Sequence, residues 1–221
     1  MKLKNKKSFF TALGFLAAFV IWTALVKLVD VQAVGPEATE VGFATMNAYI
    51  HKLTGFNKWL YDITDVLGLV PFAFAAGFGI FGLVQWIRRK SLWKVDRDII
   101  GLGVFYAAVV AVYLLFEVVV INYRPCMPEG VIEASYPSST TMLVATVIPT
   151  AIMQFAARIK NGSARWIICI LLSLFVGFMV GGRIISGVHW LSDIIGGALF
   201  SIGIVTIYYA VFSHLQKKTR Q

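Results

Sequence analysis

An arginine, a histidine and an aspartate lie close together near the C-terminal end of the chain, in the segment RIISGVHWLSD from Arg183 to Asp193. His189 and Asp193 are four residues apart, so on a helix they would share one face. The segment lies between two long apolar stretches, and ionisable groups at membrane depth are costly and usually functional. A cation, a nucleophile and a carboxylate that orients it point to chemistry on a phosphate group.

Two other roles are open to the pair of His189 and Asp193. The first is a metal site, but such a site needs more ligands. The only other histidines are His51 and His214, and the topology derived below puts His214 on the opposite side of the membrane. The second is a purely structural role, with a packed histidine held by the carboxylate.

The elements that must position these residues are membrane helices. The chain has 221 residues, of which 58% are hydrophobic, whereas a soluble domain is about 45–50% apolar. The excess falls in blocks long enough to span a bilayer, which takes about 20 residues each. We therefore predict an all-α, polytopic bundle that forms a single integral membrane domain over residues 1–221. Its six predicted spans are roughly 8–29, 63–87, 98–121, 139–158, 165–182 and 191–213.

The positive charges are distributed in a way that predicts the orientation of the bundle. The net charge is +9, and fifteen of the twenty Lys and Arg residues lie before the first span, after the second and fourth, or after the last. With six spans these segments are all on one side, which the positive-inside rule makes cytoplasmic. Both termini are then cytoplasmic in a multi-pass protein of the cell membrane. The charges serve topology, so no nucleic-acid partner is expected.

The remaining segments are expected on the outer side, at about 30–62, 122–138 and the turn at 186–189. In the first of them, the stretch VGFATMNAYIHKLTGFNKWLYDI predicts a helix lying at the membrane interface, with a plain loop as the alternative. The basic N-terminus resembles a signal peptide, but its apolar run is too long for one. A retained first helix is therefore favoured.

The outer segments also contain arginines and hydroxyl groups that suit an anion. Arg124 and Arg183 each offer a planar fork of donors to phosphate oxygens, and snorkelling toward lipid headgroups is the alternative. Ser138 follows a proline and opens a predicted helix, so it is a candidate N-cap. A helix N-terminus with free N–H groups is also an anion site.

These residues resemble the motifs of the type 2 phosphatidic acid phosphatase family, which are KxxxxxxRP, PSGH and SRxxxxxHxxxD. The third motif reads GRIISGVHWLSD here, with only its leading Ser replaced by Gly182. The first keeps Arg124 and Pro125 but has Glu117 at the lysine position. The second reads PSST from residue 137, so that Thr140 stands at the histidine position.

The resemblance implies a membrane lipid phosphatase with a covalent mechanism. His189 would attack phosphorus and form a phosphohistidine, and Asp193 would orient the imidazole and stabilise its charge. The remaining implied site residues bind phosphate: Arg124, Ser138, Ser139, Thr140 and Arg183. The partners would be membrane lipids and a lipid phosphate substrate, and no metal or other cofactor is expected.

The two departures from the motifs bear on the substrate. The family's second-motif histidine protonates the leaving group, and Thr140 is a poor general acid near neutral pH. Losing a general acid typically costs about 10²–10⁴-fold in rate, but a lipid monophosphate leaving from a diphosphate is already a stable anion. We therefore expect a lipid diphosphate, such as a polyprenyl diphosphate, to be preferred. The candidates to replace the missing acid are Glu117, His51, Glu129 and Glu133.

Three functions remain in view at this point. The first is a lipid phosphatase active on the outer face of the membrane, which the intact His189 and Asp193 favour. The second is a non-catalytic relative that binds lipid phosphates or a membrane partner, which Glu117 and Thr140 favour. The third is a small transporter, which would show inverted repeats or broken helices in paired spans, and the sequence shows neither.

Overall fold

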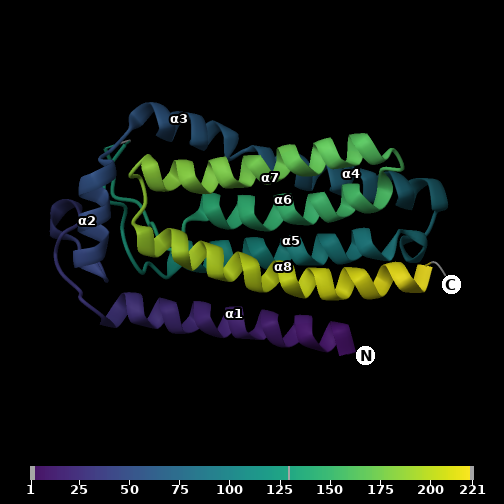
Figure 1. Ribbon diagram of the computed structural model, residues 1–221, viewed down its shortest axis with the longest axis horizontal. Helices are drawn as coiled ribbons and strands as arrows, with labels where there is room; N and C mark the ends of the chain where they lie inside the picture. The colour runs from purple at the N-terminus through teal and green to yellow at the C-terminus, as the bar shows by residue number, and fades with distance from the viewer. Residues whose placement is uncertain (1–2, 129, 220–221) are drawn as a thin grey trace.

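The chain folds into a bundle of long helices with a cap of short elements at one end. The computed structural model describes residues 3–128 and 130–219, and describes side chains for residues 6–128 and 130–213. Its helices are α1 (Leu3–Leu28), α2 (Ala44–Thr54), α3 (Lys58–Leu67), α4 (Val70–Arg89), α5 (Arg97–Val118), α6 (Ser139–Arg158), α7 (Gly162–Ile185) and α8 (Leu191–Thr219), with short 3-10 turns η1 (Pro36–Ala38) and η2 (Leu92–Lys94). Figure 1 shows the long helices running side by side, with α2 across one end and both termini at the other.

The prediction of an all-α fold with six spans is confirmed. Within the described part of the chain, six helical stretches are long and apolar enough to cross a membrane: Lys6–Leu28, Lys58–Arg89, Arg97–Val118, Ser139–Arg158, Gly162–Ile185 and Leu191–Ser213. The second stretch begins earlier than the predicted residue 63, because only Gly68 and Leu69 separate α3 from α4. The third ends before the predicted residue 121, because the backbone leaves the helical region at Val119.

The outer stretch predicted as an interfacial helix forms two helices. α2 and α3 are separated by a turn in which Gly55 has a φ of 62°, a conformation that favours glycine. Asn57 then caps α3, its side-chain oxygen accepting a hydrogen bond from the backbone N–H of Leu60 at 3.0 Å. The alternative of a plain loop is therefore wrong, while the position of α2 at a membrane interface stays a prediction.

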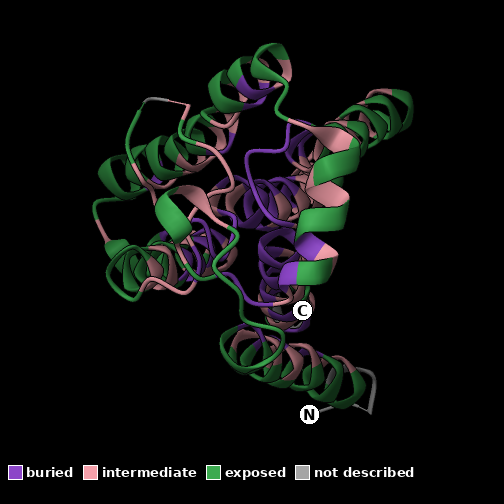
Figure 2. Ribbon diagram, turned by 90° about the vertical axis from the view of Figure 1, so that its left-hand side faces the viewer, coloured by how far each residue is buried: buried purple, intermediate pink, exposed green. Residues whose placement is uncertain are grey.

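α6 is the central helix of the bundle. It is the most buried of the six spans and packs against α4, α5, α7 and α8. Figure 2 shows this arrangement from the capped end, with buried segments gathered in the middle and exposed helix faces around them. A site at the N-terminus of α6 is therefore surrounded by the ends of other helices.

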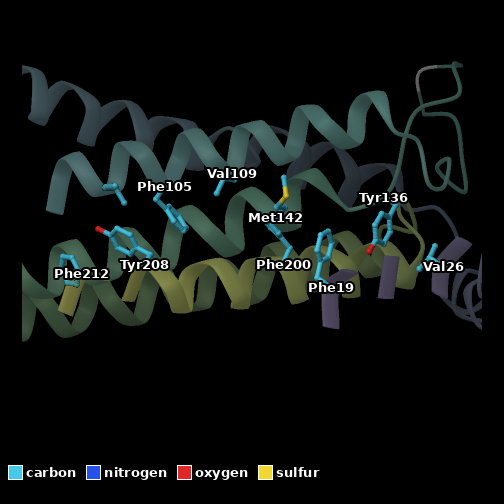
Figure 3. Packing of buried hydrophobic residues seen from close by; sticks show 10 residues of the cluster. Phe19, Val26, Phe105, Val109, Tyr136, Met142, Phe200, Tyr208 and Phe212 are labelled. Carbon is cyan, nitrogen blue, oxygen red and sulfur yellow. The ribbon is translucent and has the colours of Figure 1, made fainter. Parts of the chain in front are cut away.

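One row of apolar side chains runs along the bundle and ends beneath the cap. Figure 3 shows it extending from Phe212 and Tyr208 on α8, past Met142, to Tyr136 in the segment before α6. The Tyr136 hydroxyl is 2.7 Å from the hydroxyl of Thr23 on α1. A Cβ at residue 196 would lie 2.5 Å from the Tyr136 ring, so Gly196 lets the ring pack on α8. This packing fixes the chain immediately before α6.

Candidate active site

The sequence motifs come together at the capped end of the bundle, on the left in Figure 1. The segment between α5 and α6 is folded back on itself, since the Ser135 N–H donates to the Asn122 carbonyl at 2.9 Å and the Arg124 N–H donates to the Glu133 carbonyl at 3.0 Å. The Ser138 N–H donates to the Asp193 carbonyl at 3.1 Å. This last bond ties the start of α6 to the start of α8.

Asp193 is the centre of a buried polar network. Its side chain is inaccessible to solvent, and a buried carboxylate is tolerated only when it is well hydrogen-bonded. Oδ1 accepts from Asn122 Nδ2 at 3.1 Å and from Ser192 Oγ at 3.3 Å. Oδ2 accepts from Ser135 Oγ at 2.6 Å and from the Trp190 N–H at 3.1 Å. Both oxygens therefore have two donors each.

His189 is held in the turn between α7 and α8 with one ring nitrogen engaged and the other without a partner. The residue is 4% exposed, Nδ1 lies 2.9 Å from Ser135 Oγ, and the buried Nε2 has no hydrogen-bond partner. Burial, followed by the positive charges of Arg124 and Arg183, holds the pKa of His189 well below its ordinary value. The imidazole is therefore neutral near pH 7, and a neutral imidazole can act as a nucleophile.

The spacing of His189 and Asp193 places them on one face only if both lie in the same helix. In the structure, which describes both side chains, no direct hydrogen bond joins them. Instead, the Ser135 hydroxyl lies between them. The two residues are brought together as predicted, but the carboxylate reaches the imidazole through a third side chain. The reason is that the helix α8 begins only at Leu191, so His189 lies in the preceding turn and not on the same helical face.

Arg183 lies in the last turn of α7 and is 1% exposed. Its Nη2 donates to Thr140 Oγ1 at 2.8 Å and to Asp65 Oδ1 at 3.2 Å, and its Nη1 donates to Thr64 Oγ1 at 3.3 Å. Its Nε is buried without a partner. A buried N–H without an acceptor costs free energy comparable to a lost hydrogen bond. Such a donor beside a nucleophile suits an anionic ligand.

Arg124 also has an unsatisfied Nε. This nitrogen lies 3.0 Å from Glu133 Oε2, a distance that makes an ion pair. Nevertheless, the Nε–H group of Arg124 makes no hydrogen bond, because its N–H bond does not point at the carboxylate oxygen. The site therefore holds two guanidinium groups, each paired with a carboxylate and each with a free N–H.

The start of α6 matches its predicted cap. Ser138 is buried, and its Oγ accepts from the Thr141 N–H at 3.4 Å, which confirms it as the N-cap. Thr140 contacts Arg183, as described above. Ser139 faces a small pocket beneath the outer segment, which Glu117 and Ser135 also line. Ser138, Ser139 and Thr140 are thus all at the helix N-terminus, and the hydroxyl of Thr140 is the one that touches an arginine.

Three of the four candidates for a replacement acid are described by the structure, and they lie in different surroundings. Glu117 lines the small pocket beside Ser135, and Glu133 pairs with Arg124. His51 packs its ring against Trp190 at 5.5 Å between centroids, and burial lowers its pKa. Glu129 lies outside the residues that the structure describes. No hydrogen bond joins any of the three described candidates to the Thr140 side chain, which bonds to Arg183.

Several residues of the site were not predicted from the sequence. Asp65 and Thr64 reach Arg183 from α3, Ser135 and Asn122 come from the outer segment, and Asn47 of α2 donates to Ser192 Oγ at 2.9 Å. Of these residues, only Ser135 could have been suspected from the sequence, because it lies three residues before the N-cap Ser138. Across the described residues, no group of three or more His, Cys, Asp or Glu side chains is arranged to hold a metal ion.

Comparisons with known proteins identify the family and the fold of this chain. Residues 70–217 match the family model of the PAP2 superfamily. The fold matches the crystal structure of the first transmembrane PAP2-type phosphatidylglycerolphosphate phosphatase from Bacillus subtilis, with a TM-score of 0.63 and 17% sequence identity over 94% of this chain and 96% of that chain. A search of curated proteins gives no match. At this identity the solved structure shows a shared fold, and the two chains have nearly the same extent.

Proposed function

Because the chain belongs to the PAP2 superfamily and has the fold of a multi-pass membrane phosphatase of that type, we propose that it is a lipid phosphatase that works through a phosphohistidine at His189. One observation carries the proposal. The nucleophilic Nε2 of His189 and the Nε donors of Arg124 and Arg183 are all buried, and none of the three makes a hydrogen bond, although Arg124 Nε lies 3.0 Å from the Glu133 carboxylate. A phosphate group would supply oxygen acceptors to both arginines and a phosphorus atom to the imidazole.

The reaction divides into two displacements. In the first, the Nε2 lone pair forms a bond to phosphorus while the bond from phosphorus to the leaving-group oxygen breaks. In the second, water attacks the phosphohistidine, the nitrogen–phosphorus bond breaks, and phosphate leaves with the water oxygen. Covalent catalysis of this kind replaces one difficult step by two easier ones. The guanidinium groups stabilise the charge that develops on the phosphoryl oxygens.

The substrate class follows from the residue at position 140. Thr140 directs its hydroxyl to Arg183, and an alkyl hydroxyl is too weak an acid to protonate a departing alkoxide. A diphosphate releases a lipid monophosphate that needs no proton to leave. The proposed substrate is therefore a lipid diphosphate, such as a polyprenyl diphosphate, in preference to a phosphate monoester.

The proposed orientation places the site on the extracytoplasmic side of the cell membrane. Both chain ends and the cation-rich connections lie at the end of the bundle opposite the site (Figure 1). Positively charged connections favour the cytoplasmic side. A lipid substrate would then reach the site from the outer leaflet.

A specific observation supports a second candidate, a non-catalytic lipid-phosphate binder. Asp65 and Glu133 already pair with Arg183 and Arg124 at 3.2 Å and 3.0 Å. These carboxylates compete with phosphate for the two cations. A protein that binds a phosphate and does not cleave it would keep the arginines and lose the proton donor, and Thr140 at the position of the family's histidine supports this candidate.

The experiment that separates the two candidates is phosphate release from undecaprenyl diphosphate and from phosphatidic acid by the purified protein. We expect faster release from the diphosphate, abolished in His189→Ala. His214→Ala is the matched control, because residue 214 lies near the far end of α8. Folded wild-type protein that binds either lipid and releases no phosphate would establish the binder.

A further inference from the structure

The Ser135 hydroxyl occupies the position between imidazole and carboxylate. Ser135 is 2% exposed, and its Oγ lies 2.9 Å from His189 Nδ1 and 2.6 Å from Asp193 Oδ2. A hydroxyl has one hydrogen to donate and lone pairs to accept with. The arrangement of these three atoms therefore determines where each proton lies.

The carboxylate has no proton to give, so the Ser135 hydroxyl must donate to Asp193 Oδ2. The Ser135 oxygen is then an acceptor toward His189, which requires a hydrogen on Nδ1. The opposite tautomer would leave Oδ2 and Nδ1 as competing acceptors for one hydrogen and would place an N–H on Nε2, where no acceptor lies. We propose that Ser135 is a positioning residue that links His189 to Asp193 and holds the imidazole as the Nδ1–H tautomer, leaving Nε2 free.

The protein holds Ser135 from both sides of its chain. Its backbone N–H donates to the Asn122 carbonyl at 2.9 Å, and the Asn122 side chain donates to Asp193 at 3.1 Å. The next residue, Tyr136, is 1% exposed and stacks on Phe19 at 6.4 Å between ring centroids. Hydrogen bonds on both its backbone and its side chain, together with a packed neighbour, hold the residue in one geometry. Ser135 therefore has little freedom to leave the line between the two side chains.

The catalytic consequence of this tautomer rests on the proposed function. When Nε2 bonds to phosphorus, the imidazole ring gains positive charge and Nδ1–H becomes a stronger donor. Ser135 Oγ accepts that bond and donates its own hydrogen to Asp193. The carboxylate thus stabilises the charge through the hydroxyl, and no proton has to move to Asp193.

The direct test is ¹⁵N NMR of the histidine rings in the full chain, labelled with ¹⁵N-histidine and held in lipid nanodiscs. The chain has only three histidines, so His189→Gln identifies the His189 signals. In the wild type we expect Nδ1 to show the shift of a protonated nitrogen and Nε2 that of an unprotonated one. A wild-type His189 protonated on Nε2 would overturn the proposal.

The variants extend the test to Ser135 itself. Ser135→Ala removes the hydroxyl oxygen that accepts the hydrogen bond from His189 Nδ1, so the His189 signals should move toward those of the other tautomer. Ser135→Thr keeps a hydroxyl, so the wild-type His189 signals should remain. Ser173→Ala is the matched control, because Ser173 is exposed on α7 and bonds only within its own helix. Unchanged His189 shifts in folded Ser135→Ala would also overturn the proposal.

A second readout connects the tautomer to the chemistry. A misplaced reacting group can cost about 10²-fold in rate, and we expect a fall of that order in the rate of phosphoenzyme formation by Ser135→Ala, with recovery in Ser135→Thr. An unchanged rate would contradict the proposed role. If the NMR shifts behave as expected but no phosphoenzyme forms in any variant, the proposed function fails while the tautomer assignment stands.

Discussion

Two arginines at opposite ends of the bundle show how similar chemistry serves different purposes. Arg158, at the end that carries both termini, donates to Gln154 and to Asp98 and lies over the Phe81 ring. Arg183, at the capped end, also has polar partners and an aromatic neighbour, but its buried Nε has none. The Arg158 side chain is 28% exposed and that of Arg183 is 2% exposed.

Under the proposed function, this difference separates an arginine that ties helices together from one that binds a ligand. Water can reach Arg158, so any unpaired donor there costs little. Arg183 is shielded from water, so its unpaired donor has a cost that an oxyanion would remove. His189 differs from an ordinary packed histidine in the same way, because its buried Nε2 has no hydrogen-bond partner while its Nδ1 has one. The comparison can be tested by removing or altering each group in turn.

The largest expected effect comes from removing each arginine. Loss of one preorganised donor to a developing oxyanion costs about 10²–10³-fold in rate, and Arg183→Ala should lower phosphate release by that order. Arg158→Ala should lower thermal stability and leave the rate per folded molecule unchanged. Steady-state phosphate release, normalised to folded protein, checks both. Equal losses of rate in the two variants would show that Arg183 and Arg158 do not differ in their roles.

The next effect concerns the contact between Thr140 and Arg183. Thr140→Val keeps the shape and removes the shorter of the two hydrogen bonds that Nη2 donates, and a lost hydrogen bond to a charged group costs about 1.5–3 kcal/mol. This corresponds to a fall of roughly 10–100-fold in kcat/KM for the diphosphate. Thr206→Val on α8 is the control, since its hydroxyl bonds only to its own helix. A rate that survives Thr140→Val would mean that this contact does not position Arg183.

The third effect is on stability as a function of pH. Because the pKa of His189 is lowered in the folded state, the unfolded chain binds a proton that the folded chain does not. This holds below the ordinary histidine pKa of about 6.5. Stability should therefore fall as the pH drops below that value, by up to about 1.4 kcal/mol per pH unit from this residue. His189→Gln should reduce the slope between pH 5 and 6.5 in thermal unfolding, and identical slopes would show that His189 is not held neutral.

The smallest effect is expected from the carboxylate beside Arg183. The Asp65 side chain is 55% exposed, and exposed ion pairs contribute about 0.2–1 kcal/mol. Asp65→Asn should remove the competition with phosphate and lower KM by about 2–5-fold, with kcat retained. Asp62→Asn, which breaks the exposed pair with Lys58 in the same helix, is the control. A large loss of kcat in Asp65→Asn would instead identify Asp65 as a proton-transfer group.

Hydropathy and spacing predicted much of this molecule. The six spans follow from apolar blocks, which the bilayer requires, and the residues of the third motif are brought to one end by the topology. The break at Gly55 was missed because the stretch around it was predicted as one interfacial helix. The junction of α3 with α4 was missed because one apolar window covers both helices of that span. Asp65 was missed for the same reason, since it was read as part of a continuous membrane helix.

The expectation that His189 and Asp193 share one helical face failed for a different physical reason. The spacing argument assumes a helix, but His189 lies in a turn, and its neighbours are set by the irregular segment between α5 and α6. The position of Ser135 depends on long-range bonds to Asn122 and Asp193. No periodicity in the sequence encodes such bonds, so the hydroxyl between imidazole and carboxylate was found only in the structure.

The most direct test of the central claim is to trap the covalent intermediate. Protein mixed with a lipid diphosphate labelled at its terminal phosphate should be quenched in alkali, which preserves phosphohistidine, and the label then located by peptide mapping. We predict label on His189 in the wild type and none in His189→Ala. Release of phosphate without labelled protein, or label on another residue, would contradict the account.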